Sequence, residues 1–167
     1  MRMELIQPFI SAADAVFADC LQGPTKIGDL SMEEETYRRK GVAALIAIRG
    51  EIEGRVILDL SPEVALKVAS QLSGGPVTES AQVVRETVCE LANMVIGNSV
   101  TLLNDQGFRF KVFPPEIHES ESGLESSKDT EAMVICVETS CGDIYLNISM
   151  HYLHRRREER KTVSAID

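Results

Sequence analysis

The chain has 167 residues, of which 44% are hydrophobic and only 5% aromatic, and it contains no tryptophan. This length suits one domain whose core is filled by aliphatic side chains. The formal net charge of −9 argues against a nucleic-acid-binding protein, because such a protein presents a cationic face to phosphates. The same acidity would repel an anionic membrane surface, and no apolar run approaches the length of a membrane span. We therefore expect neither nucleic acid nor membrane as a partner.

The four cysteines, Cys20, Cys89, Cys136 and Cys141, form neither a CxxC pair nor a zinc-like cluster. Cys20 and Cys89 fall within helical apolar patterns, where a thiol acts as a small hydrophobe. Residues 1–9 lack the apolar core of a signal peptide. These features predict reduced thiols and a cytoplasmic protein without a metal site.

The start of the chain predicts an amphipathic helix. Apolar residues recur at three- and four-residue steps over residues 4–21, and Gly23-Pro24 ends this pattern. The next stretch, 25–40, mixes acidic and basic residues and allows a strand at its start.

A hairpin and a second helix follow. The runs Val42–Arg49 and Gly54–Leu60 are rich in β-branched and aliphatic residues, which favours two paired strands. Ser61 is a suitable N-cap for a helix that begins at Pro62, and a Gly-Gly-Pro sequence closes that helix.

The longest predicted helix runs from Thr78 or Ser80 to Asn104, with Gly107 as its expected terminator. Segment 114–131 then contains six acids, one lysine and several serines, which is typical of a solvated, mobile loop.

A second hairpin is predicted from Met133–Glu138 and Ile144–Tyr152. Strict alternation of apolar and polar residues over 144–151 predicts that this strand buries one face only. Two helix-plus-hairpin units thus predict an α+β fold, with a mostly antiparallel sheet and the helices packed on one face. We expect a single domain over residues 1–154 and a polar tail over 155–167.

The long helix carries an unusual polar stripe. At about 100° per residue, Glu86, Glu90, Asn93 and Gly97 fall within a ~60° sector. Any surface helix has a polar stripe, but Asn93 costs roughly half a kcal/mol and Gly97 up to about 1 kcal/mol of helix stability, which indicates close approach by another protein. Asn98 lies nearer the apolar side, where we expect a hydrogen-bonded internal group. The opposite, core-facing side is expected to hold Val84, Val88, Leu91, Val95 and Leu102.

Glu90–Asn98 reads E-x-x-N-x-x-x-G-N, and this stretch resembles a motif of the CheC/CheX/FliY phosphatases of bacterial chemotaxis. The opening Gln7-Pro8-Phe9 resembles the start of CheX-like members, and residues 42–72 resemble the family as well, so the similarity extends to about residue 152. The motif occurs once, as in CheX-like members. Glu86 stands where the family usually has Asp or Ser, although the longer carboxylate of Glu could still take the same role.

The resemblance implies a phosphatase that hydrolyses the aspartyl phosphate of a phosphorylated, CheY-like response regulator in chemotaxis or a related two-component pathway. It assigns Asn93 to positioning the attacking water and Glu90 to an ion pair with the regulator's lysine, with Glu86 and Gly97 as docking surface. The receiver domain of the regulator would supply Mg²⁺, so this chain would need no cofactor of its own.

One alternative is a non-catalytic binding module of the same fold that docks on a response regulator or a flagellar-switch component. The intact pair Glu90 and Asn93 favours the phosphatase. CheX-like proteins form dimers, and strand edges could pair in this way, but the sequence leaves the oligomeric state and the particular regulator open.

The histidines and the basic tail are weaker candidates. His151 and His154 are spaced like a metal pair, but one ends a strand and the other opens a polar tail, so we expect no metal there. His118 lies in the acidic segment and is expected to be solvated. The basic residues of 155–161 are mixed with acids, which favours a solvated helix.

Overall fold

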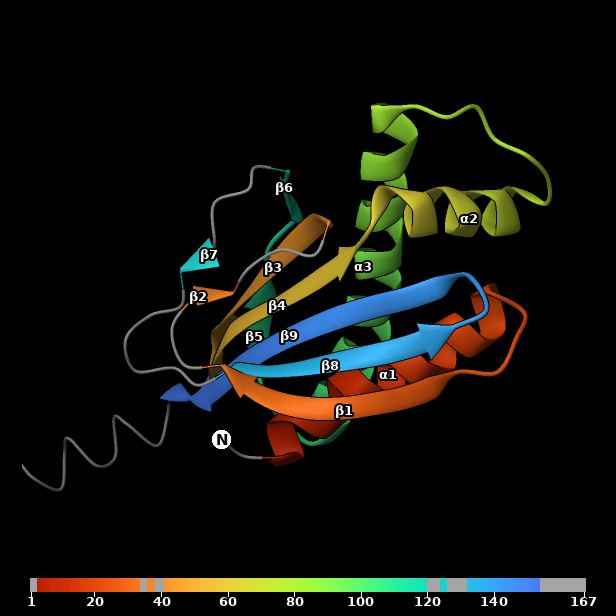
Figure 1. The fold of residues 1–167 in the computed structure, drawn as a ribbon. Helices are drawn as coiled ribbons and strands as arrows, with labels where there is room; N and C mark the ends of the chain where they lie inside the picture. The colour runs from red at the N-terminus through yellow and green to blue at the C-terminus, as the bar shows by residue number, and fades with distance from the viewer. Residues whose placement is uncertain (1–2, 34–35, 38–40, 120–123, 126–131, 154–167) are drawn as a thin grey trace, which may run out of the picture.

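The computed structural model describes residues 3–33, 36–37, 41–119, 124–125 and 132–153 (Figure 1). In this part of the chain, helices α1, α2 and α3 accompany a seven-stranded antiparallel sheet and a two-stranded one. The helices are α1 Met3–Cys20, α2 Pro62–Ser73 and α3 Ala81–Asp105. The strands are β1 Lys26–Glu33, β2 Thr36–Tyr37, β3 Val42–Gly50, β4 Ile52–Leu60, β5 Phe110–Val112, β6 Glu116–His118, β7 Leu124–Glu125, β8 Ala132–Thr139 and β9 Gly142–Tyr152.

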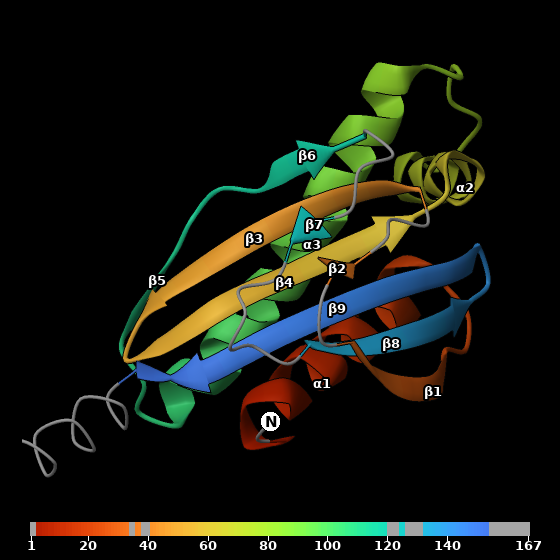
Figure 2. The same cartoon turned by 60° about the vertical axis from the view of Figure 1, so that its left-hand side comes forward.

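The two predicted hairpins, β3–β4 and β8–β9, form the middle of the large sheet. Its strand order is β1-β8-β9-β4-β3-β5, and β6 also pairs with β3. Strands β4 and β9 join the hairpins side by side over eight residue pairs, from Ile52↔Tyr152 to Asp59↔Tyr145. Helices α1 and α3 lie against the same face of this sheet, whereas α2 lies toward one end (Figures 1 and 2). The predicted α+β class and the packing of helices on one face are therefore confirmed.

The core lies between the helices and this face of the sheet. Helix α1 buries a stripe that includes Leu5, Phe9 and Phe17, and the sheet contributes Ile48 and Ile148. Each such side chain contributes roughly 1.5–3 kcal/mol by leaving water, which is why aliphatic and phenylalanine side chains suffice without tryptophan.

Local capping sets the ends of α2 and α3. The Ser61 hydroxyl accepts a hydrogen bond from the Val64 amide at 3.2 Å, and the Ser80 hydroxyl accepts one from the Val83 amide at 3.1 Å. Gly74 ends α2 in the left-handed conformation with φ of 80°, a conformation that costs other residues more. These contacts confirm both predicted helix starts, with Ser80 rather than Thr78 as the cap of α3.

The prediction that 114–131 is a loop is wrong for two short segments. Residues 116–118 form β6, which pairs with β3, and residues 124–125 form β7. β-Pairing with a strand far away in the sequence overrides the loop-like composition here. Residues 120–123 and 126–131 of this segment, together with His154 and the tail 155–167, lie outside the described residues.

The prediction that β9 buries one face only is also wrong. Asn147 and Ser149 are 0% and 2% exposed, although they point away from the helices. A second apolar cluster of Ala43, Ile57 and Val134 lies on that face. The small sheet β2–β7 also lies on this side of the large sheet (Figures 1 and 2). Polar positions that alternation alone assigns to water are thus buried on a second, partly apolar face of the sheet.

Candidate functional site

Helix α3 is anchored through one side, so its opposite side faces outward. Val84, Val88, Leu91 and Val95 are buried as predicted, and α3 packs against α1, α2 and β3. The predicted site residues Glu86, Glu90, Asn93 and Gly97 are all exposed.

The buried stripe winds around α3, which corrects two predictions. Leu102 is 39% exposed and Asn98 is exposed, whereas Leu103 is fully buried. At about 100° per residue, the buried positions in the second half of the helix are turned by roughly 90° from those in the first half. The two halves therefore contact different neighbours, and Asn98 and Leu102 leave the buried side.

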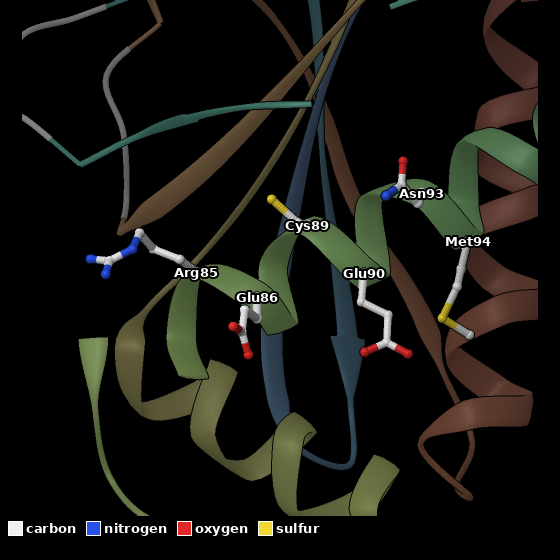
Figure 3. A pocket seen from close by; sticks show the side chains of 6 residues that line it. All are labelled: Arg85, Glu86, Cys89, Glu90, Asn93 and Met94. Carbon is white, nitrogen blue, oxygen red and sulfur yellow. The ribbon is translucent and has the colours of Figure 1, made fainter. Parts of the chain in front are cut away.

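A surface pocket of about 560 Å³ lies along the exposed side of α3 (Figure 3). It brings Glu86, Glu90 and Asn93 together. Gly97 is not among its lining residues, but a Cβ atom added at Gly97 would meet nothing within 4 Å, so the backbone there is open to approach. The pocket is lined by Arg85, Glu86, Cys89, Glu90, Asn93 and Met94.

Neither Glu90 nor Asn93 has a hydrogen-bond or ion-pair partner in the part of the chain that the structure describes. Glu86, by contrast, accepts a hydrogen bond from the Gln82 amide at 2.9 Å. Because unpaired polar groups at a surface are free to contact another molecule, Glu90 and Asn93 are the groups that a docking protein would meet.

Glu90 and Asp19 both lie near Cys20, at the end of α1. The pKa of the Cys20 thiol is raised by burial and, to a smaller extent, by the charges of Asp19 and Glu90, so these groups lie near one another. Cys20 is also the last residue of α1, and the carboxyl end of a helix carries partial negative charge. This arrangement attracts a cation from outside the chain.

Cys89 lies in the pocket between Glu86 and Asn93, but its surroundings do not suit a nucleophile. Burial raises the pKa of the Cys89 thiol, so the thiol stays protonated at neutral pH. Since the thiolate is the nucleophilic form of cysteine, the pocket offers a carboxamide and two carboxylates rather than a group that forms a covalent intermediate.

His118 and His151, the histidines that the structure describes, do not line this pocket. His118 is half-buried on β6 rather than solvated, and its Nε2 lies 3.7 Å from a Glu116 carboxylate oxygen. His151 Nε2 lies 3.6 Å from a Glu53 carboxylate oxygen on the neighbouring strand. Among the described residues, no group of three or more His, Cys, Asp or Glu side chains could hold a metal ion.

Sequence reasoning missed three of the residues that line the pocket, namely Arg85, Cys89 and Met94. Helical spacing could have indicated them, because they flank the polar stripe on either side. No helix among the described residues is long and apolar enough to cross a membrane.

Comparison with known proteins agrees with the fold. The CheC-like superfamily protein from Shewanella sp. PV-4 superposes with a TM-score of 0.79 at 21% identity, over 90% of this chain and 99% of that one. The chain thus has the α+β fold of CheC-like proteins.

The family follows from closer matches. The model of the chemotaxis phosphatase CheX family matches residues 42–138. The CheY-P phosphatase CheX of Thermotoga maritima is 27% identical over 118 residues, covering 70% of this chain and 76% of that protein. The CheX–CheY–BeF₃–Mg²⁺ complex from Borrelia burgdorferi contains a chain that is 30% identical, with a TM-score of 0.72 over 90% of this chain and 99% of that one. This chain belongs to the chemotaxis phosphatase CheX family and is a phosphatase.

Proposed function

We propose that this protein hydrolyses the aspartyl phosphate of a CheY-like response regulator, with Asn93 positioning the attacking water and Glu90 binding the regulator's lysine. The observation that carries this proposal is that both side chains lie on one exposed stripe of α3 without partners among the described residues. The Thermotoga maritima relative is a CheY-P phosphatase, and the Borrelia burgdorferi relative forms a complex with CheY, which supports this substrate.

The chemistry of the substrate suits a site with no nucleophile. An aspartyl phosphate is an activated mixed anhydride, so its hydrolysis chiefly needs an aligned water and stabilised charge on the phosphoryl oxygens. The Asn93 carboxamide can accept a hydrogen bond from the water through its oxygen and donate one to a phosphoryl oxygen through its NH₂ group. A carboxylate at this position would instead repel the phosphoryl group.

Glu90 suits an ion pair with a lysine on the regulator. The negative field from Asp19 and the carboxyl end of α1 favours a cation at this point, and the Glu90 carboxylate has no competing partner among the described residues. Glu86 and Gly97 extend the docking surface, because Gly97 lets another backbone approach closely.

The Mg²⁺ of the reaction belongs to the regulator in this proposal. The complex from Borrelia burgdorferi contains Mg²⁺ together with CheY, which supports this assignment. A receiver domain also carries out its chemistry in the cytoplasm, where this protein would act.

The proposal is tested by mixing the purified chain, in amounts far below the substrate, with a phosphorylated CheY-like receiver domain. We expect the chain to accelerate phosphate release over many turnovers and to require Mg²⁺. Stoichiometric binding without faster release would instead support the non-catalytic binding module.

We also propose that the protein forms a homodimer through strand β1. This strand ends the described strand order of the large sheet, and its Leu30 and Met32 are each 48% exposed. An exposed apolar edge favours pairing with a second strand. Light scattering should give a dimer for the native chain and a monomer for Leu30→Lys, whereas a monomeric native chain would contradict the proposal.

A further inference from the structure

Arg85 is the cationic residue among the six that line the pocket. Its side chain points to the opposite side from Met94 and away from the Asn93 amide (Figure 3). Asn93 follows Arg85 by eight positions, which corresponds to about 12 Å along the helix axis. The Arg85 guanidinium is turned away from Asn93 (Figure 3) and is paired with Glu119, so we assign Arg85 to docking rather than to the hydrolysis step.

Arg85 already holds a carboxylate. Its guanidinium lies 3.3 Å from a carboxylate oxygen of Glu119, the residue that follows β6, and the two side chains are 44% and 46% exposed. An ion pair with this exposure contributes only about 0–1 kcal/mol, so it exchanges readily for another carboxylate. Glu119 has a further interaction of its own, so its charge does not depend on Arg85 alone.

The charges are distributed unevenly along the pocket. Arg85, with the Glu86 carboxylate beside it, places the pocket's positive charge at the end nearer the start of α3, whereas Glu90 and the nearby Asp19 contribute only negative charges further along. A protein that docks with an acidic side chain over Arg85 and a basic one over Glu90 is favoured, and the reversed orientation is repelled. Because Asn93 lies one turn beyond Glu90, this orientation also decides which group of the partner reaches the carboxamide.

We propose that Arg85 is a specificity-determining residue that binds a carboxylate of the docked response regulator and releases Glu119 as it does so. This inference rests on the proposed function, since it takes the phosphorylated regulator as the partner. It adds a second anchor, outside the motif residues Glu90 and Asn93, that orients the regulator on α3.

The test compares Arg85→Gln with Glu119→Gln in steady-state phosphate release and in direct binding to the phosphorylated receiver. For Arg85→Gln we expect KM and Kd to rise about fivefold or more, with kcat unchanged and a weaker dependence of Kd on salt. Arg85→Lys should recover part of the affinity. For Glu119→Gln we expect KM to stay the same or to fall, because Arg85 is then free to bind the regulator.

If the pair only holds β6 against α3, the two Gln variants will raise KM equally and lower Tm equally, and the proposal is wrong. An unchanged KM and Kd in Arg85→Gln also overturns it. The variant Asn93→Ala distinguishes failure of the proposed role of Arg85 from failure of the proposed function. If Asn93→Ala is inactive while Arg85→Gln behaves as the native chain, only the role of Arg85 fails; if Asn93→Ala keeps full turnover, the catalytic assignment fails.

Discussion

The carboxamide of Asn93 differs from the charged groups in the pocket because it both donates and accepts hydrogen bonds. The ionised carboxylates of Glu86 and Glu90 are acceptors only, the Arg85 guanidinium is a donor only, and the Cys89 thiol is weak in both functions. Positioning a water next to a phosphoryl oxygen requires both functions at once. At the scale of the residue, the proposed chemistry therefore depends on one side chain, and the remaining polar residues serve binding.

We expect Asn93→Ala to lower the turnover number by about 10²-fold or more, because it removes an orientation effect. The fold should remain intact or gain about half a kcal/mol, since alanine is the better helix former at an exposed position. Phosphate release and thermal unfolding measure the two effects. Asn104→Ala, at another exposed asparagine of α3, is the matched control and should keep full turnover. Native turnover in Asn93→Ala would contradict the assignment.

Glu90→Gln should weaken both binding and turnover, because it removes the charge that pairs with the regulator's lysine but keeps the shape of the side chain. The affinity of the native chain for the phosphorylated regulator should also fall more steeply with salt than that of Glu90→Gln. Calorimetric binding at two salt concentrations measures this difference. Asp105→Asn removes an exposed charge outside the pocket, and it should change neither the affinity for the regulator nor the dependence of that affinity on salt. Equal salt dependence in the native chain and Glu90→Gln would show that Glu90 makes no ion pair.

At the scale of the element, α3 combines a well-capped start with residues that lower its own stability. The Ser80 cap and the buried residues Val88, Leu91 and Val95 hold the helix in place. This support lets the exposed side carry Asn93 and Gly97, which would weaken an isolated helix. The helix is thus stabilised by tertiary packing, and its outer side is free to serve docking.

Gly97→Ala separates these two roles of the helix. A methyl group at this position meets nothing within 4 Å, so the variant should be more stable by up to about 1 kcal/mol. The same methyl group would push a docked regulator away, and we expect weaker binding. Urea unfolding and a binding titration measure both quantities. A more stable variant with native affinity would remove Gly97 from the docking surface.

At the scale of the whole molecule, the large sheet is buried on both faces near its centre. Asn147 on β9 lies between Ile57 of β4 and Val134 of β8, which belong to the second apolar cluster. Both polar atoms of its side chain are buried and have no hydrogen-bond partner within the described ranges. A buried amide in this state costs about 1–3 kcal/mol of stability.

Asn147→Leu should therefore raise the free energy of unfolding by about 1 kcal/mol or more, because leucine fits an apolar surrounding and needs no hydrogen bond. Chemical denaturation of the two proteins measures this change. Val134→Leu adds a methylene group in the same cluster and reports whether extra volume alone is tolerated. A less stable Asn147→Leu variant, with a tolerated Val134→Leu, would contradict the prediction and show that the amide of Asn147 contributes to stability.

Much of the candidate site could be predicted from the sequence because it lies within one helix. The spacing of Glu86, Glu90, Asn93 and Gly97 is a local property, and the 3.6-residue period places them on one side wherever the helix packs. Caps such as Ser80 are equally local, since they depend on hydrogen bonds to residues three positions away. The roles proposed for these residues remain predictions until the variants are measured.

Tertiary structure alone decided the features that join distant parts of the chain. The ion pair of Arg85 and Glu119 links residues 34 positions apart. Glu90 of α3 lies near Asp19 at the end of α1, and Asn147 is buried between strands β4 and β8, beside Ile57 and Val134. Local periodicity reports which side of an element is apolar, but it contains no information about which neighbour covers that side. For this reason the helices, the hairpins and the polar stripe could be predicted from the sequence, whereas the pocket around that stripe and the second buried face depend on how the chain packs.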